Sequence, residues 1–141
     1  MIEVVNRQRK IKIGAAGWRE FAVRVASEIP EADEKSLTAA FVSDGKMREL
    51  NNLYRGVNKT TDVLSFGSEP DEFGADETYL GDIAISLEQA HRQAEENDLD
   101  FETEIKQLIL HGILHLCGFD HETDNGEMNR RELCLRKTLM I

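Results

Sequence analysis

Cysteine and long apolar segments are scarce in this chain of 141 residues. Its two cysteines, Cys117 and Cys134, are too few to indicate a disulfide scaffold. No apolar run approaches the roughly 20 residues that a membrane-spanning helix needs, so no membrane partner is expected. The N-terminus also lacks a basic stretch followed by an apolar one, which argues against a secretory signal. We therefore expect a cytoplasmic protein.

Positive charge is the other deficit, because 17 lysines and arginines stand against 27 acidic residues, for a formal charge of -10. Taken alone, this balance argues against a nucleic-acid partner. The basic residues are nevertheless concentrated at the two ends of the sequence, with six in residues 1–26 and four in residues 129–141. This distribution permits a basic face built from the two ends of the chain.

Length and composition favour one folded domain spanning residues 1–141. Hydrophobic residues make up 40% of the chain and charged residues 31%, as is typical of globular proteins. Alternating apolar residues predict four strands, and a fifth short segment is either a separate strand or a continuation of the first. The four strands are expected at 2–5, 37–41, 63–66 and 79–85, and the extra segment at 10–13.

Helical periodicity and capping residues predict five helices. Trp18 begins a core stripe that Pro30 stops, Asp44 caps a helix that carries Met47, Leu50 and Tyr54 on one face, and Ser86 opens a third. Asp100 caps a fourth helix that runs to Leu116, and Asp124 starts the last. Residues 69–77 are acidic and are interpreted as an exposed loop. These patterns predict an α+β fold, with a small mixed four-stranded sheet packed against about five helices.

Three of the four histidines lie within eleven residues, in the spacing His111-x3-His115-x5-His121. Positions four apart on a helix differ by about 40° in azimuth and roughly 6 Å in height, so His111 and His115 share one face. Gly118 stands where a helix often ends in a left-handed residue, which would let the chain reverse and return His121. Three imidazoles with one open position describe a catalytic zinc site.

The same spacing is close to that of the metzincin peptidases, except at the position after the first histidine. Those enzymes use a glutamate there as general base, whereas this chain has Gly112. The peptidase base is therefore missing. Cys117 would point about 200° away from the histidine face and is expected in the core, as is Cys134. His91 lies on a polar helix face and is interpreted as a surface residue.

A second unusual stretch runs from Tyr54 to Phe66, across a helix-to-strand turn. Arg55 could hold a phosphate in a bidentate fork, and Lys59 could add a point charge. By composition alone, a basic turn at the surface is the commoner explanation of both residues.

Taken together, the two stretches resemble the YbeY family of bacterial metal-dependent endoribonucleases. The resemblance rests on Tyr54-Arg55-Gly56, on TDVLSF at 61–66, on LGDIAIS at 80–86 and on HGILHLCGFDH at 111–121. These segments span about the last two-thirds of the chain.

The resemblance implies a zinc-dependent endoribonuclease, specific for single-stranded RNA, with a fold similar to that of zinc peptidases. It implies a role in ribosomal RNA processing, notably at the 3′ end of the small-subunit RNA, and in ribosome quality control, with ribosomal RNA, the ribosome or its assembly proteins as partners. His111, His115 and His121 would bind one Zn²⁺ per chain, and Arg55 would be the catalytic arginine. Three imidazoles also accept nickel, cobalt or copper.

Two rival functions remain at the level of the sequence. A metallopeptidase would use the same histidines, but this chain has no base at position 112, where it carries glycine. A non-catalytic assembly factor would use zinc to stabilise the C-terminal turn and would close the site with a fourth ligand. In the nuclease, Asp120 is a candidate base or a carboxylate that orients a histidine, and a substrate oxygen is the other candidate base.

Overall fold

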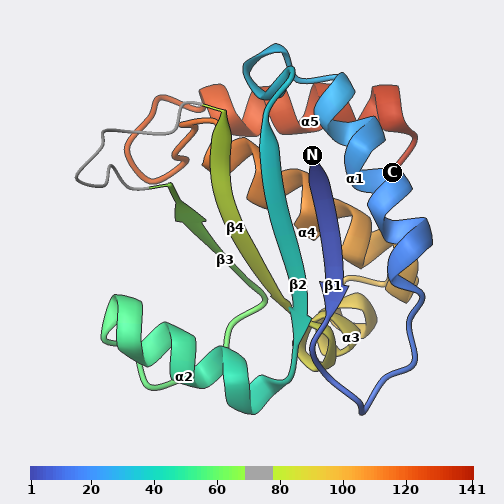
Figure 1. Cartoon of the computed structure of the whole chain (residues 1–141), viewed down its shortest axis with the longest axis vertical. Helices are drawn as coiled ribbons and strands as arrows, with labels where there is room; N and C mark the ends of the chain where they lie inside the picture. The colour runs from blue at the N-terminus through green and yellow to red at the C-terminus, as the bar shows by residue number, and fades with distance from the viewer. Residues whose placement is uncertain (69–77) are drawn as a thin grey trace.

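The computed structural model describes residues 1–68 and 78–141, so the loop expected at 69–77 lies outside the described residues. The four predicted strands are all present: β1 (Ile2–Asn6), β2 (Ser36–Val42), β3 (Val63–Gly67) and β4 (Tyr79–Ser86). They form one sheet in the order β1-β2-β4-β3 (Figure 1). β1, β2 and β4 are parallel and β3 is antiparallel to β4, so the sheet is mixed and β3 forms one edge.

The extra strand expected at residues 10–13 is wrong, because the structure has no strand there. The Gln8 side chain takes up the backbone groups of this segment instead. Its amide donates to the carbonyl oxygen of Ile11 at 2.7 Å, and its own oxygen accepts from the Ile11 N–H at 2.9 Å. A backbone bonded to a side chain in this way has no groups left for a sheet ladder.

The five predicted helices are present, with shifted ends at several positions. They are α1 (Ala15–Ser27), α2 (Asp44–Arg55), α3 (Leu87–Glu96), α4 (Phe101–Leu116) and α5 (Glu127–Leu139), and a 3-10 turn follows α1 at Pro30–Ala32. The N-cap of α2 is Ser43 and not Asp44, since the Ser43 hydroxyl accepts the Lys46 N–H. Asp44 instead bonds the side chains of Ser86, Thr60 and Arg92.

Apolar side chains on the two faces of the sheet form two separate clusters. On one face, Leu37, Phe41 and Ile83 join α1 and α4 in the main core, which also includes Trp18 as predicted. On the other face, Met47 of α2 packs against Val42, Leu64 and Ala84. Alternation along each strand produces this division, because successive side chains point to opposite faces. The sheet therefore lies between α4 on one side and α2 on the other.

The far end of α2 extends past the sheet, and this changes the environment of Tyr54 (Figure 1). Met47 is fully buried, but Tyr54, predicted on the same helix face, is 63% exposed. Gly56 ends α2 in the left-handed conformation at φ 69°, as the sequence predicted.

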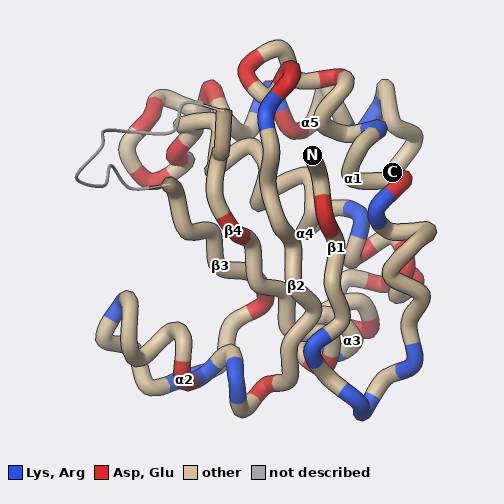
Figure 2. Tube along the Cα trace, viewed as in Figure 1, with Lys and Arg blue, Asp and Glu red and all other residues tan. Residues whose placement is uncertain are grey.

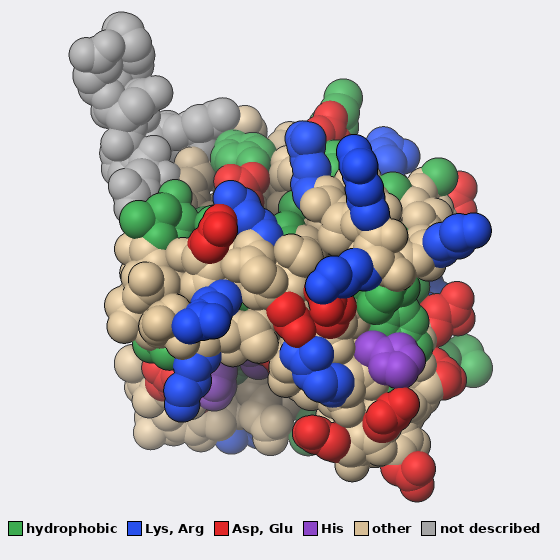
Figure 3. All heavy atoms as spheres, turned by 90° about the horizontal axis from the view of Figure 1, so that it is seen from below, with side chains coloured by type: hydrophobic (Ala, Val, Ile, Leu, Met, Phe, Trp, Pro, Cys, Tyr) green, Lys and Arg blue, Asp and Glu red, His purple; other side chains and the backbone are tan. Residues whose placement is uncertain are grey.

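Charge is distributed differently from the single basic face that the sequence permitted. Lys and Arg lie along the loop between β1 and α1 at one end of the molecule, whereas α5 lies at the other end (Figure 2). Viewed from the end that carries α2 and α3, basic side chains stand between acidic and polar ones (Figure 3). Within the described ranges, no helix has the length and apolar character required to span a membrane.

Candidate metal centre

Helix α4 carries the first two histidines of the candidate centre. Asp100 caps it as predicted, with the Thr103 N–H donating to its carboxylate at 2.7 Å. The helix packs over the sheet, and buried apolar side chains cover most of its circumference. His111 and His115 leave it on the same side, with ring centroids 4.8 Å apart. The sheet therefore fixes the direction in which both imidazoles point.

The third histidine returns to the first two through a tight reversal after α4. Gly118 has φ +97°, the left-handed conformation predicted for it, and it lets the chain turn back at the end of the helix. The His121 ring then lies 5.4 Å from each of the other two ring centroids. One nitrogen of each histidine lies within 4.8 Å of the others. Thus residues 111, 115 and 121 come together as predicted.

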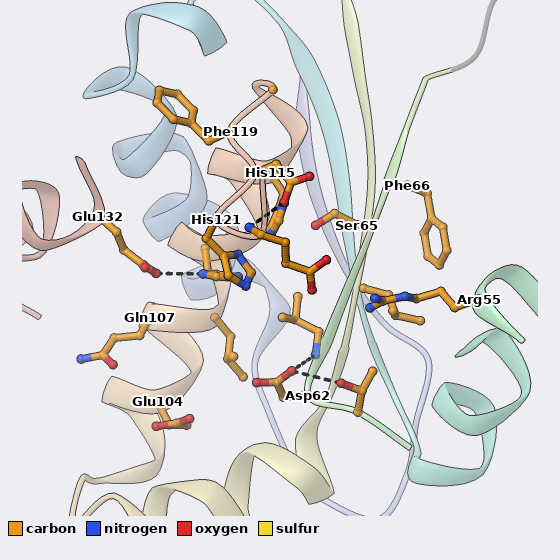
Figure 4. A pocket seen from close by; sticks show the side chains of 18 of the residues that line it. Arg55, Asp62, Ser65, Phe66, Glu104, Gln107, His115, Phe119, His121 and Glu132 are labelled. Atoms are coloured by element: carbon orange, nitrogen blue, oxygen red, sulfur yellow. Dashed lines mark hydrogen bonds and ion pairs between the residues drawn. The ribbon is translucent and has the colours of Figure 1, made fainter. Parts of the chain in front are cut away.

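Glu132 of α5 orients His111 from the side away from the cluster. The Glu132 carboxylate lies 3.1 Å from His111 Nδ1, and the side chain is buried (Figure 4). A carboxylate only accepts hydrogen bonds, so Nδ1 carries the proton and Nε2 presents its lone pair. Burial raises the pKa of Glu132, but the bond to His111 and the charge of Arg136 outweigh it, leaving the pKa below its ordinary value. Glu132 is therefore ionised at neutral pH.

The pKa of His115 is lowered from its ordinary value of 6.5, first by burial and then by His111 and His121. Its imidazole is neutral at pH 7, the form in which a nitrogen can bind a metal. Three imidazoles, one of them held by a carboxylate, suit a zinc ion. Among the described residues, no cysteine, aspartate or glutamate joins the three histidines. The residues present thus fit a metal with an open position.

A cavity of about 990 Å³ opens beside the histidines. It runs between edge strand β3 and helix α4 and continues to α5 and the end of α2 (Figure 4). Its walls combine aromatic, basic and acidic side chains with the histidines, among them Tyr54, Arg55, Phe66, Glu104, His115 and Asp120.

Arg55 lies at the end of α2 and extends into this cavity (Figure 4). Its helix packs on the opposite face of the sheet from α4, so the arginine reaches the histidine side around β3, the edge strand of the sheet. Lys59 does not line the cavity; it is exposed, and its carbonyl oxygen accepts the Asn51 amide at 2.9 Å. The structure therefore brings Arg55, and not Lys59, to the site.

Asp120 also lines the cavity, but its carboxylate stabilises the loop that follows α4. It accepts the backbone N–H of Glu122 at 3.0 Å, and the Asp120 carbonyl accepts the N–H groups of Thr123 and Asp124. The histidine-orienting role considered for Asp120 belongs to Glu132. Asp120 instead stabilises the turn that carries His121.

Packing between α4 and the sheet requires glycine at position 112, which the sequence does not reveal. A Cβ at this position would lie 2.9 Å from Cγ2 of Ile83, a fully buried β-branched residue of β4. The same glycine offers its carbonyl oxygen to the Ser65 hydroxyl at 3.2 Å. Helix and sheet approach so closely here that no larger side chain fits, which excludes the glutamate that peptidases of similar spacing use.

Two carboxylates beside the site were missed at the level of the sequence. Glu132 and Glu104 are 7% and 4% exposed, respectively. A signal was present: Met128, Glu132 and Leu135 fall on one helical stripe, and Glu104 shares the face of His111 by its spacing of seven. A charged residue in an otherwise apolar stripe marks a buried interaction.

The remaining cysteine and histidine predictions have different outcomes. Cys117 packs against the main core, and burial raises the pKa of its thiol to about 11, so the thiol stays protonated. Cys134, by contrast, is exposed on α5, which contradicts its predicted packing role. His91 is exposed on α3 beside Glu95, 3.9 Å away, as expected for a surface histidine.

The fold and the site define a class: small α+β proteins in which three histidines, two on a buried helix and one after its end, converge beside an open cavity. Comparison with known proteins specifies the family. Residues 3–139 match the family model described as Endoribonuclease YbeY, and the chain belongs to this family.

Several proteins named Endoribonuclease YbeY are similar to the chain over most of its length. One from Caldanaerobacter subterraneus is 39% identical, with 93% of this chain and 92% of the relative covered. One from Syntrophotalea carbinolica is 40% identical, covering 93% and 87%. A Thermotoga maritima protein solved in solution superposes with a TM-score of 0.66 at 26% identity, covering 99% of this chain and 89% of that one.

Proposed function

We propose that this chain is a zinc-dependent endoribonuclease that cleaves single-stranded RNA in ribosomal RNA processing, including the 3′ end of the small-subunit RNA. Its proposed setting is the cytoplasm, in ribosome quality control and in contact with the ribosome or its assembly proteins. Residues 1–141 would act as one catalytic domain. Family membership supports the activity, and one observation carries it: three histidines converge beside a cavity that Arg55 also enters.

His111, His115 and His121 would hold the ion, with one position left for substrate or water. A bound zinc ion would supply a Lewis acid and lower the pKa of water towards about 7. Glu132 keeps His111 in the tautomer that offers Nε2, and burial keeps His115 neutral. These residues prepare the ligand set before a metal arrives.

Arg55 would bind the scissile phosphate. Its guanidinium is a planar fork of donors that matches two phosphate oxygens and stays charged at every physiological pH. As phosphorus becomes pentacoordinate, negative charge grows on those oxygens, and a preorganised cation favours that state over the ground state. Gly112 supplies no base. The proton of the attacking water would therefore pass to Asp120, which lines the cavity, or to a substrate oxygen.

The two rival functions have less support. For a peptidase, the contact of Gly112 with Ile83 leaves no room for a glutamate base. For a non-catalytic assembly factor, a closed site is expected, but among the described residues the cluster contains three ligands and a large adjoining cavity. A phosphate-binding arginine is also unnecessary for a purely structural metal.

The test combines metal analysis with cleavage. Purified protein is expected to contain about one zinc ion per chain by mass spectrometry. It should cut a single-stranded RNA and spare the duplex of the same sequence, and a chelator should abolish cleavage.

The variants His115→Ala and Arg55→Ala should each lose cleavage by at least about a hundredfold, because the first removes a metal ligand and the second a cation that stabilises the transition state. The matched control is His91→Ala. His91 is an exposed histidine that does not line the cavity, so this variant should keep full activity. Full activity in metal-free His115→Ala would refute the nuclease proposal. Chelator-sensitive cleavage of peptides without cleavage of RNA would favour the peptidase.

A further inference from the structure

An aromatic pair lies outside the candidate metal centre but beside it, and the metal does not explain the pair. Tyr54 lies in the last turn of α2 and Phe66 lies on β3. Their ring centroids are 4.9 Å apart and the rings are inclined by 56°. Both residues line the cavity that contains the three histidines. Phe66 packs against the smaller apolar cluster, whereas Tyr54 rests on Phe66 and is 63% exposed.

The exposure of Tyr54 is part of a local pattern. Large apolar side chains that remain exposed include Leu53 and Tyr54 in the last turn of α2 and Val57 just after it. Leu53 is even more exposed, at 74%, but does not line the cavity. Exposed apolar groups gathered at one place usually mark a binding surface. Of these three residues, Tyr54 is the one that belongs to the site.

The chain places this pair next to the phosphate-binding group. Arg55 directly follows Tyr54, and Phe66 and Arg55 lie on the side of β3 opposite the histidines, with Arg55 pointing back towards them (Figure 4). A nucleotide whose phosphate contacts Arg55 thus has its base or that of its neighbour within reach of an aromatic face. β3 is the edge strand of the sheet, and among the described residues no further strand pairs with its outer side.

We propose that Tyr54, supported from behind by Phe66, is a stacking platform for one base of the RNA next to the scissile phosphate. This rests on the proposed function and adds to it the physical basis of strand selectivity. A base in a duplex already has both faces covered by its neighbours, whereas a single-stranded base can turn out and stack on an aromatic ring. The adjacent cation favours a nucleotide over an apolar protein segment as the occupant.

Stacking can be measured directly with a fluorescent base. A short single-stranded RNA carries 2-aminopurine at one position, and the position is moved along the strand. Rapid mixing with metal-loaded protein records fluorescence quenching before cleavage begins. At one position we expect strong quenching, and Tyr54→Ala should abolish it and weaken binding roughly 5- to 150-fold, as for loss of one base–aromatic stack.

Three matched variants separate stacking from general effects. Tyr54→Phe keeps the ring and should bind within about twofold of the parent. Leu53→Ala removes a neighbouring exposed side chain that does not line the cavity and should change nothing. Phe66→Leu removes the supporting ring but keeps an apolar side chain in the cluster, and should give a partial loss of quenching. Circular dichroism and thermal melting confirm that each variant is folded.

Steady-state cleavage of the same RNA separates this proposal from the proposed function. If the platform acts in binding, Tyr54→Ala raises KM and leaves kcat close to the parent value. Quenching and affinity that are unchanged in Tyr54→Ala overturn the platform, even where the parent cleaves RNA normally. A parent that stacks the base through Tyr54 but never cleaves RNA would overturn the nuclease and leave the platform in place. A parent that binds no single-stranded RNA overturns the platform.

Discussion

The three histidines of the cluster are supported in different ways. His111 is held by the Glu132 carboxylate at 3.1 Å, and His115 is kept neutral by burial beside two other imidazoles. His121 is exposed and depends on the loop that Asp120 stabilises. The tautomer of His111 is thus set by a residue 21 positions away in the chain. A carboxylate that accepts the far N–H of a metal-bound imidazole also makes its other nitrogen more basic.

Replacing Glu132 therefore tests the metal proposal without touching a ligand. Glu132→Gln keeps the shape of the side chain but removes its charge, and we expect zinc affinity to fall by about 10- to 100-fold. Competition with a zinc-binding dye measures the change. The control is Glu95→Gln, which removes a carboxylate from the exposed pair with His91. Equal affinities in all three proteins would contradict the role of Glu132.

The buried carboxyl group of Glu104 makes the folding stability of the protein depend on pH. Burial raises its pKa above the ordinary value of 4.5, and nearby Asp62 adds to this, although Asn97 opposes it. The folded state therefore binds this proton more tightly than the unfolded state, so ionising Glu104 costs stability as pH rises through the folded-state pKa. Below pH 4.5, where both states are protonated, the cost is absent.

Accordingly, Glu104→Gln should unfold at a higher temperature than the parent at pH 7, and this difference should shrink as the pH is lowered towards 4. Thermal melts across this range measure it. The matched change is Glu102→Gln, in the same first turn of α4 but exposed, which should leave the pH profile unaltered. A Glu104→Gln variant less stable than the parent at pH 7 would show that the ionised carboxylate stabilises the fold.

At the scale of elements, the site depends on how closely α4 approaches β4. Gly112 faces Ile83 with no space for a methyl group, and the Ser65 hydroxyl of β3 bonds the Gly112 carbonyl. This contact sets the height of α4 over the sheet. The histidines, one position before and three after Gly112, are placed by it. Helix packing, rather than the chemistry of a base, therefore explains the glycine.

Enlarging this residue should destabilise the protein. A methyl group in a packed core costs about 1–3 kcal/mol, while replacing a helical glycine by alanine returns up to about 1 kcal/mol. We expect a net loss of about 1 kcal/mol for Gly112→Ala, measured by chemical denaturation. Gly17→Ala in α1, where an added Cβ meets no atom within 4 Å, should stabilise instead. If both variants gained stability, the close contact at Gly112 would be disproved.

At the scale of the whole molecule, the histidines join segments that are otherwise connected by a loop. His111 and His115 belong to α4, His121 belongs to the segment after it, and Glu132 extends the connection to α5. A metal bound here would cross-link the C-terminal third of the chain. Because such a ligand binds the folded state, it stabilises that state by mass action.

Zinc should thus raise the melting temperature. When free zinc is at a hundred times its dissociation constant, the free energy of unfolding should increase by about 2.7 kcal/mol. Chelation should reverse the shift, and acidification should weaken it, because an imidazole nitrogen binds a metal only when it carries no proton. His121→Ala should lose most of the effect, whereas His91→Ala should keep it. Identical melting curves with and without zinc would refute a metal bound by the folded protein.

The sequence by itself determined the strands, the helices, the spacing of the histidines and the left-handed Gly118, because hydrophobic periodicity and capping act over a few residues. Only the tertiary structure decided what meets across long separations: Arg55 with the cavity, Glu132 with His111, and Gly112 with Ile83. It also overturned the strand at 10–13, where the Gln8 side chain bonds the backbone. It decided as well that Tyr54 is exposed, because α2 extends past the sheet (Figure 1). Such contacts depend on packing between elements, and no short window of sequence contains both partners.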